Sequence, residues 1–304
     1  MKLLERVAAG EVLISDGAMG TLLYAKGLTA GECPESWCVS HPDVVRDIAA
    51  AYVAAGSDIV ETNSFGGSAY KLKAYGFADR VAEFNRAAAE LAKEAIGQRG
   101  YVAASVGPTG QMVEAEGGDV SERQLYEAFR EQVVALAEGG ADAICVETMS
   151  SLAEAVQAIR AAKENTGLPV ICTFTFEPGI KGFRTMMGLR PERAAREAAA
   201  AGADLVGANC GNGIANMIEI AKLMRAAVPG VPILIQCNAG APVVVDGKTV
   251  FTETPEYMAG CVPELVAAGA NVIGGCCGTT PDHIRAMRRA VRSLFNAETQ
   301  RSQR

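Results

Sequence analysis

Residues 201–211 read AGADLVGANCG, and this stretch decides the fold because variants of it recur along the chain. AGSD at 55–58, GGAD at 139–142, AGAD at 201–204 and AGAN at 268–271 each place a glycine after an alanine-rich segment and before an apolar run. A glycine there suits the left-handed residue that terminates a helix. The repeat therefore predicts four copies of a unit in which a helix ends and a strand begins.

Apolar runs of strand length recur between segments of helical period. Eight such runs lie at 12–15, 58–62, 101–106, 143–148, 170–176, 204–208, 232–237 and 271–275. The helical segments lie at 42–55, 79–96, 121–138, 151–164, 191–201, 214–227, 255–268 and 281–295. Helix starts are indicated by Ser40 and Ser121 at N-cap positions and by Pro42, Pro191 and Pro281 in first turns.

A helix between each pair of successive strands makes the strands parallel, and strands that are apolar throughout are buried on both faces. Eight such units predict an α/β protein, a single-domain (β/α)₈ TIM barrel. The alternative, an open doubly wound sheet, typically carries GxGxxG after its first strand, whereas the turn here reads DGAMGTLL. We expect the barrel to span 1–295 and the polar residues 296–304 to form a C-terminal tail.

The composition excludes several classes of protein. The 304 residues carry a formal net charge of -7 and no long run of Lys or Arg, which argues against nucleic-acid binding. Glu5 and Arg6 interrupt the N-terminal segment where a signal peptide would be apolar, so we expect a cytoplasmic protein without a membrane span. Nine cysteines, an odd number, indicate reduced thiols, and only two histidines leave thiolates or carboxylates as the main ligands for any metal.

Polar and thiol side chains follow the repeat at a constant distance. Seven residues after the four glycines stand Asn63, Glu147, Asn209 and Cys276, and the next positions hold Ser64, Thr148, Cys210 and Cys277. These positions are the carboxyl ends of four strands, the end at which barrel enzymes place their active sites. The longer segments 107–120, 177–190 and 239–254 lie at the same end and are candidate lids or docking surfaces.

Three cysteines are candidate metal ligands: Cys210 in GANCGNG, and Cys276 with Cys277 in IGGCCGTT. Adjacent strand residues point to opposite faces, so Cys276 and Cys277 can share one ion only where the backbone leaves strand geometry, which the flanking glycines permit. Three thiolates suit Zn²⁺ and leave a fourth position for a substrate. The alternative is that these thiols only pack in the interior, as we expect of the other six cysteines.

These residues stand in a series of motifs that resembles the homocysteine S-methyltransferase family. In order over 12–288 the motifs are DGAMGTLL, HPDVV with AGSDIVETNSFG, SVGPTG, ICVETM, GANCG, CNAGAP and GGCCGTTPDHI. They are most similar to the homocysteine-binding module of cobalamin-dependent methionine synthase. The resemblance implies a barrel in which Cys210, Cys276 and Cys277 hold Zn²⁺, with homocysteine as the fourth ligand and no other catalytic residue.

The resemblance also implies a set of substrate contacts. Carboxylates would face the amino group of homocysteine, backbone amides of the first turn would hold its carboxylate, and polar strand-end residues would line the pocket. The residues are Asp16 and Glu147 for the amino group, Gly17 and Met19 for the carboxylate, and Thr62, Asn63 and Ser105 for the lining. Asn238, at the end of the seventh strand, is expected to hydrogen-bond near the metal or to occupy its fourth position in the absence of substrate. Turn formation by Asp16, internal hydrogen bonding by the lining residues and a capping role for Asn238 are the structural alternatives. Glu61 has no assigned role, and His283 is expected on the surface of the last helix.

The implied reaction is zinc-dependent methyl transfer to the thiol of homocysteine, which gives methionine. A methylcobamide on a separate corrinoid protein is the first candidate for the donor, because this chain shows no cobalamin-binding segment. S-methylmethionine or S-adenosylmethionine, used by stand-alone members of the family, is the alternative donor. A zinc-binding partner protein without catalytic activity is the alternative of another class.

Overall fold

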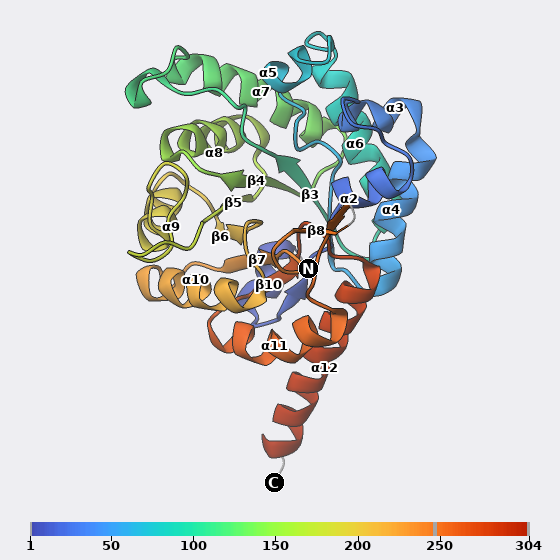
Figure 1. Cartoon of the computed structure of the whole chain (residues 1–304), viewed down its shortest axis with the longest axis vertical. Helices are drawn as coiled ribbons and strands as arrows, with labels where there is room; N and C mark the ends of the chain where they lie inside the picture. Colours follow the sequence, from blue (N-terminus) through green and yellow to red (C-terminus); the bar gives the residue numbers. More distant parts are fainter. Residues whose placement is uncertain (1, 246–247, 303–304) are drawn as a thin grey trace.

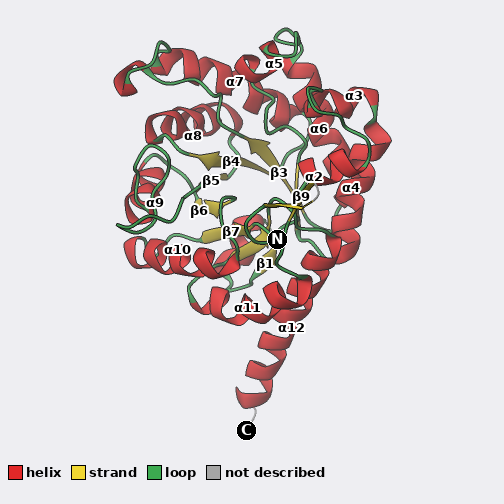
Figure 2. Cartoon of the chain, in the orientation of Figure 1, coloured by secondary structure: helices red, strands yellow, loops and turns green. Residues whose placement is uncertain are grey.

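Eight parallel strands form a ring that helices surround (Figures 1 and 2). The computed structural model describes residues 2–245 and 248–302. The strands are β1 (Leu13–Ile14), β2 (Ile59–Glu61), β3 (Tyr101–Val106), β4 (Ala143–Met149), β5 (Val170–Phe174), β6 (Leu205–Asn209), β7 (Ile233–Cys237) and β10 (Val272–Gly275). Their order in the sheet is β1-β10-β7-β6-β5-β4-β3-β2, with parallel pairing throughout. The predicted barrel is confirmed.

Eight of the described helices follow the predicted segments, and four short ones were not predicted. The eight are α4 (Pro42–Ala55), α6 (Val81–Ile96), α7 (Glu122–Glu138), α8 (Leu152–Thr166), α9 (Pro191–Ala200), α10 (Ile214–Ala227), α11 (Pro255–Ala267) and α12 (Pro281–Ser302). The four short ones are α1 (Leu3–Ala8), α2 (Gly20–Ala25), α3 (Trp37–Ser40) and α5 (Ala69–Lys73). Single 3₁₀ turns lie at Pro34–Ser36 and Glu114–Glu116. The backbone of the predicted tail is therefore helical as far as Ser302, while the side chains beyond 296 lie outside the described part of the chain.

The glycine repeat has the conformation that the sequence predicts. Gly56, Gly140, Gly202 and Gly269 have φ of 108°, 95°, 110° and 103°, each at the junction between a helix and the next strand. Ser121 caps α7 as expected, since its Oγ accepts a hydrogen bond from the Gln124 amide. The cap predicted at Ser40 is wrong, because Ser40 ends α3 and His41 precedes α4.

Carboxylates close the ring between β1 and β2, where no regular ladder of strand pairs forms. The Asp58 amide donates to the Ile14 carbonyl at 2.7 Å, and the Asp58 carboxylate accepts from the Ile14 amide at 2.9 Å. Nearer the carboxyl ends, the Asp16 carboxylate accepts from the Glu61 amide at 2.8 Å. Two aspartate side chains thus replace the strand hydrogen bonds that this seam lacks, and Asp16 is held at the mouth of the barrel.

The interior of the barrel changes from apolar to polar along the strands. At the amino ends, Leu3 and Val7 of α1 cover a buried apolar cluster of Leu13, Ile59, Ala103, Ala143, Ile171, Leu205, Leu234 and Val272. Two residues further along each strand, where the side chain faces the same side, stand Ser15, Glu61, Ser105, Cys145, Thr173, Gly207, Gln236 and Gly274. These positions are all polar or small, so a polar floor lies above the apolar plug.

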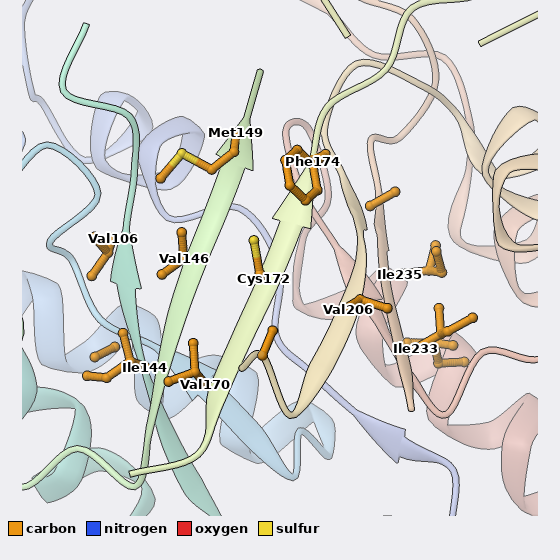
Figure 3. Packing of buried hydrophobic residues seen from close by; sticks show 14 of the residues in the cluster. Val106, Ile144, Val146, Met149, Val170, Cys172, Phe174, Val206, Ile233 and Ile235 are labelled. Atoms are coloured by element: carbon orange, nitrogen blue, oxygen red, sulfur yellow. The ribbon is translucent and has the colours of Figure 1, made fainter. Parts of the chain in front are cut away.

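The outer faces of the strands pack against the surrounding helices through aliphatic side chains. Figure 3 shows this layer on β3 to β7, where Val146, Cys172, Val206 and Ile235 belong to the main buried cluster. This packing fixes the positions of the strands, so the loops at their carboxyl ends can form a site on a rigid support.

One predicted loop has structure of its own. The segment 239–254 contains an antiparallel hairpin, β8 (Val243–Val245) with β9 (Lys248–Val250). The hairpin lies after β7, at the carboxyl end of the barrel. It therefore belongs to the rim of the mouth.

Candidate functional site

A pocket of about 350 Å³ opens at the carboxyl ends of the strands. Its wall comes from the turn after β1, from the segments after β2 and β6, and from the loop after β10. The residues are 17–21, 34–35, 61–65, Ser105, Glu147, Thr148, Asn209, Cys210, Gln236 and 275–277. None of these described lining residues is Lys, Arg or His, so the side chains of the pocket supply thiols and carboxylates without a balancing cation.

The three predicted ligand cysteines meet at this pocket and form its thiol cluster. The Sγ atoms of Cys210, Cys276 and Cys277 all lie within 4.8 Å of one another, and Cys210 and Cys277 are 3.8 Å apart. β10 ends at Gly275, so both vicinal cysteines stand beyond the strand, as their sharing of one site requires. Gly278, with φ of 80°, turns the chain immediately after them.

The backbone of the thiol cluster is fixed by hydrogen bonds between neighbouring strand ends. The Cys276 amide donates to the Cys237 carbonyl at 2.7 Å, and the Cys210 amide donates to the Gln236 carbonyl at 3.2 Å. The Thr279 hydroxyl donates to the Cys276 carbonyl at 2.7 Å and accepts from the Ala18 amide at 3.2 Å. The loops after β1, β6, β7 and β10 therefore position the thiols before any ligand binds.

The thiols of the cluster share protons. Hydrogen bonds from Cys276 and Cys277 lower the pKa of Cys210 to about 3, while the same contact raises the pKa of Cys277 to about 11. Burial opposes the shift at Cys210, whereas the Gly211 amide and the Asn238 side chain add to it. One thiolate thus exists near neutral pH even without a cation, which is the form that binds metals.

Three carboxyl groups form the acidic floor of the site: Glu61 and Glu147 line the pocket, and Asp16 lies behind its lining. Burial raises the pKa of Asp16 to about 7 and raises the pKa of Glu61 and Glu147 as well. The negative charge of Glu147 adds to the shift at both other groups. A cationic group that enters this floor would be stabilised by charges that are otherwise unpaired.

Asn209 holds Glu147 in place through a buried four-bond network. Its Nδ2 donates to Glu147 Oε2 at 2.8 Å and to Thr148 Oγ1 at 2.7 Å. Its Oδ1 accepts from the Thr148 amide at 2.9 Å and from the Thr173 hydroxyl at 2.7 Å. Thr148 and Cys210, the residues that follow Glu147 and Asn209, both have left-handed backbones, with φ of 58° and 61°. The network therefore supports a strained segment at each of the two strand ends.

The other residues predicted from the sequence are distributed between the pocket and its supports. Gly17 and Met19 lie in the wall, and a Cβ at Gly17 would lie 2.6 Å from Thr279 Oγ1. Thr62, Asn63 and Ser105 also line the pocket, but each uses its side chain in the fold. Their partners are Ser64 and the Ser105 amide for Thr62, the Pro34 carbonyl for Asn63, and Glu147 for Ser105.

Asp16 and Asn238 stand behind the wall rather than in it. Asp16 is 1% exposed and bonds the Glu61 amide. Asn238 is buried, its side chain contacts Cys210, and its Oδ1 has no partner among the described residues. Asp16 therefore contacts the backbone of the lining residue Glu61, and Asn238 contacts the thiol of Cys210.

The sequence analysis assigned no role to two residues that line the pocket, Glu61 and Gln236. The alternation of side chains along β2 and β7 is the signal that could have placed them inside the barrel. The expectation for His283 was wrong: the ring is 7% exposed, accepts from the Thr280 amide at 3.1 Å and contacts the Glu253 carbonyl at 3.0 Å. The other six cysteines pack as expected; five are buried and Cys261 is half-buried.

Among the helices that the structure describes, none has the length and apolar content needed to cross a bilayer.

Comparison with known proteins points to one family. The sequence matches the family described as homocysteine S-methyltransferase over residues 13–291. Methionine synthase of Mycobacterium tuberculosis is 32% identical over 313 residues, which cover 97% of this chain and 26% of that protein. Methionine synthase of Mycobacterium leprae is 32% identical over 321 residues, covering 99% of this chain and 26% of that protein. This chain thus spans about a quarter of the length of these curated relatives.

Solved structures share the fold. The metallated form of the homocysteine methyltransferase MmuM from Escherichia coli superimposes with a TM-score of 0.74 at 24% identity, covering 92% of this chain and 96% of that chain. The similarity supports the barrel and the placement of its strand ends.

Proposed function

Because the chain belongs to the homocysteine S-methyltransferase family, we propose that it transfers a methyl group to the thiol of homocysteine and forms methionine. The observation that carries the proposal is the convergence in one pocket of three thiols and the carboxyl groups of Glu61 and Glu147, with Asp16 behind the lining. The thiols suit a soft metal ion, and the carboxyl groups suit the ammonium of an amino acid. We propose the reducing cytoplasm as the compartment, in keeping with nine cysteines free of disulfides.

The thiol cluster fits zinc by its donor set and its spacing. Tetrahedral coordination with Zn–S bonds of about 2.3 Å places two sulfurs about 3.8 Å apart, and Cys210 and Cys277 are separated by 3.8 Å. The three thiols are half-buried and adjoin the pocket, so a fourth position would face the substrate. A zinc ion bound there would supply Lewis acidity that deprotonates a substrate thiol and keeps its sulfur nucleophilic.

The residues of this chain would bind and orient the substrate. Glu147, held by Ser105 and Asn209, and Asp16, held by the Glu61 amide, would accept hydrogen bonds from the ammonium group. The backbone of the Gly17–Met19 turn would receive the substrate carboxylate on the opposite wall. The substrate sulfur would then lie toward the thiol cluster, with its free side toward the mouth and the methyl donor.

We propose a methylcobamide on a separate corrinoid protein as the donor. Support comes from the methionine synthase relatives and from apolar side chains exposed on the loops around the mouth. Met112, Ile180, Met186 and Val244 are 48%, 107%, 80% and 77% exposed. Exposed apolar residues on several loops at one end of the barrel suit a protein partner.

The test is methionine formation by zinc-loaded protein with homocysteine and one donor at a time. The donors are methylcobalamin, S-methylmethionine and S-adenosylmethionine, and we expect turnover with methylcobalamin. Turnover restricted to a sulfonium would contradict the corrinoid donor and leave the methyl transfer intact. Zinc binding without methyl transfer from any of the three donors would contradict the enzymatic function and favour a zinc-binding partner protein.

A further inference from the structure

Two side chains of the pocket floor, Glu61 and Gln236, take no part in the reaction as outlined above. Glu61 ends β2 and Gln236 lies on β7, and both line the pocket. Gln236 Nε2 donates to Glu61 Oε1 at 2.9 Å, while Gln236 Oε1 is buried with no partner among the described residues. The pair therefore presents hydrogen-bond acceptors to the pocket that the protein leaves unsatisfied.

Glu61 differs from its two neighbours in how its carboxyl group is supported. Glu147 receives hydrogen bonds from Ser105, Thr148 and Asn209. Glu61 receives one from Gln236 and a weak one from the Cys145 thiol. A half-buried carboxyl group in a pocket wall with so few donors has acceptor capacity that a ligand can use.

The charges around Glu61 indicate what that ligand carries. Burial raises the pKa of Glu61 well above its usual range, and the charges of Glu147 and Asp16 raise it further. No cationic side chain lies among the described lining residues. A ligand group that brings both positive charge and several N–H donors would satisfy Glu61 and Glu147, the two carboxyl groups that line the pocket, and an ammonium has three donors.

We propose that Glu61, positioned by Gln236, is a third acceptor for the substrate ammonium and makes the pocket select thiols that carry a free amino group. The inference rests on the proposed function, since it assigns the floor to an amino-acid substrate. It adds a specificity-determining residue to the two carboxylates implied by the family motifs. Methionine, the expected product, carries the same ammonium and needs neither donor nor thiol chemistry to bind.

The experiment compares methionine with 4-(methylthio)butanoate, which is methionine without its amino group, by isothermal titration calorimetry. Wild-type protein should prefer methionine strongly. Glu61→Gln keeps the shape but removes the charge, and hydrogen bonds to a charged group contribute about 1.5–3 kcal/mol. We therefore expect the preference to fall about 10- to 100-fold, with binding of 4-(methylthio)butanoate maintained.

Two further variants separate recognition from a general effect on the fold. Glu154→Gln removes another buried carboxylate. Glu154 lies in the first turn of α8, accepts a hydrogen bond from the Thr109 amide and lies outside the pocket lining. Glu154→Gln should keep the full preference for methionine. Gln236→Met removes the side chain that positions Glu61 and should reduce the preference in the same direction, which provides a second test if Glu61→Gln folds poorly.

The outcomes distinguish this inference from the function on which it rests. An unchanged preference in Glu61→Gln, or equal weakening of both ligands, would overturn the role of Glu61 while leaving the methyltransferase proposal in place. Failure of wild-type protein to bind either methionine or homocysteine would overturn both. A lost preference in Glu61→Gln, with the preference kept in Glu154→Gln, would support the assignment.

Discussion

Replacing Asn209 with Ala should remove the support of the amine-binding side of the pocket. Asn209 is 1% exposed and makes four hydrogen bonds of 2.7–2.9 Å, to Glu147, Thr173 and both the amide and the hydroxyl of Thr148. Alanine leaves all four partner groups without this contact. It also releases the left-handed backbone of Thr148, which has φ of 58°.

The size of the effect follows from these bonds. A neutral hydrogen bond contributes about 1 kcal/mol net and a bond to a charged group about 1.5–3 kcal/mol. The three bonds to neutral groups and the one bond to Glu147 sum to about 5 kcal/mol of stabilisation. Water that enters from the pocket in the variant offsets part of this loss. We therefore expect a loss of about 4 kcal/mol, a large share of the total stability of a typical domain.

The assay is urea unfolding of the reduced, metal-free protein followed by circular dichroism. Thr173→Val serves as the matched control, because it removes only the bond to Asn209 Oδ1 and should cost about 1 kcal/mol. Asn209→Ala should also weaken methionine binding, since loss of a donor to Glu147 disfavours its ionised form. A cost for Asn209→Ala no greater than that for Thr173→Val would refute the idea that this network supports the site.

Three further predictions concern the floor, the thiol loop and the seam of the barrel. Burial raises the pKa of Asp16 from 3.8 to about 7. The native state therefore binds this proton more tightly than the unfolded chain does, and the protein loses stability as the pH rises through about 7. Asp16→Asn should therefore gain stability over wild type between pH 4 and pH 7, by up to about 4 kcal/mol; a difference that is independent of pH in urea unfolding would contradict this. Gly275→Ala would place a Cβ against the Thr279 side chain and should lower bound zinc, measured by mass spectrometry; a full complement of zinc in this variant would contradict the close packing of the thiol loop. Asp58→Ala removes the carboxylate that accepts from the Ile14 amide and pairs with two arginines; it should cost about 3 kcal/mol with zinc content unchanged, and a loss of zinc would show that seam and site are coupled.

Local periodicity was sufficient to predict the eight barrel strands, the eight helices that follow them and the level at which the site lies, but not the short helices or the β8–β9 hairpin. The count of seven residues from each repeat glycine put Glu147 and Asn209 at equivalent strand ends, and the structure joins them by a 2.8 Å hydrogen bond. This works because each βα unit repeats the same local geometry. The height of a residue in the barrel can therefore be inferred from its position within its own unit.

Contacts between strands distant in sequence were not predictable in this way. The seam depends on Asp58 and Ile14, and the Glu61–Gln236 pair joins residues 175 positions apart. Such pairs follow from the order of strands around the barrel and from its closure. His283 shows the same limit, because its burial results from the position of the loop that carries Glu253.

The most direct test of the central claim is the zinc content of purified, reduced protein by mass spectrometry, for wild type, Cys276→Ala and Cys172→Ala. Cys172 is a fully buried thiol outside the thiol cluster and is the matched control. The account predicts about one zinc per chain in wild type and Cys172→Ala, from the three-ligand site, and far less in Cys276→Ala. Full zinc in Cys276→Ala, or no zinc in wild type, would contradict the assignment of the metal to this cluster.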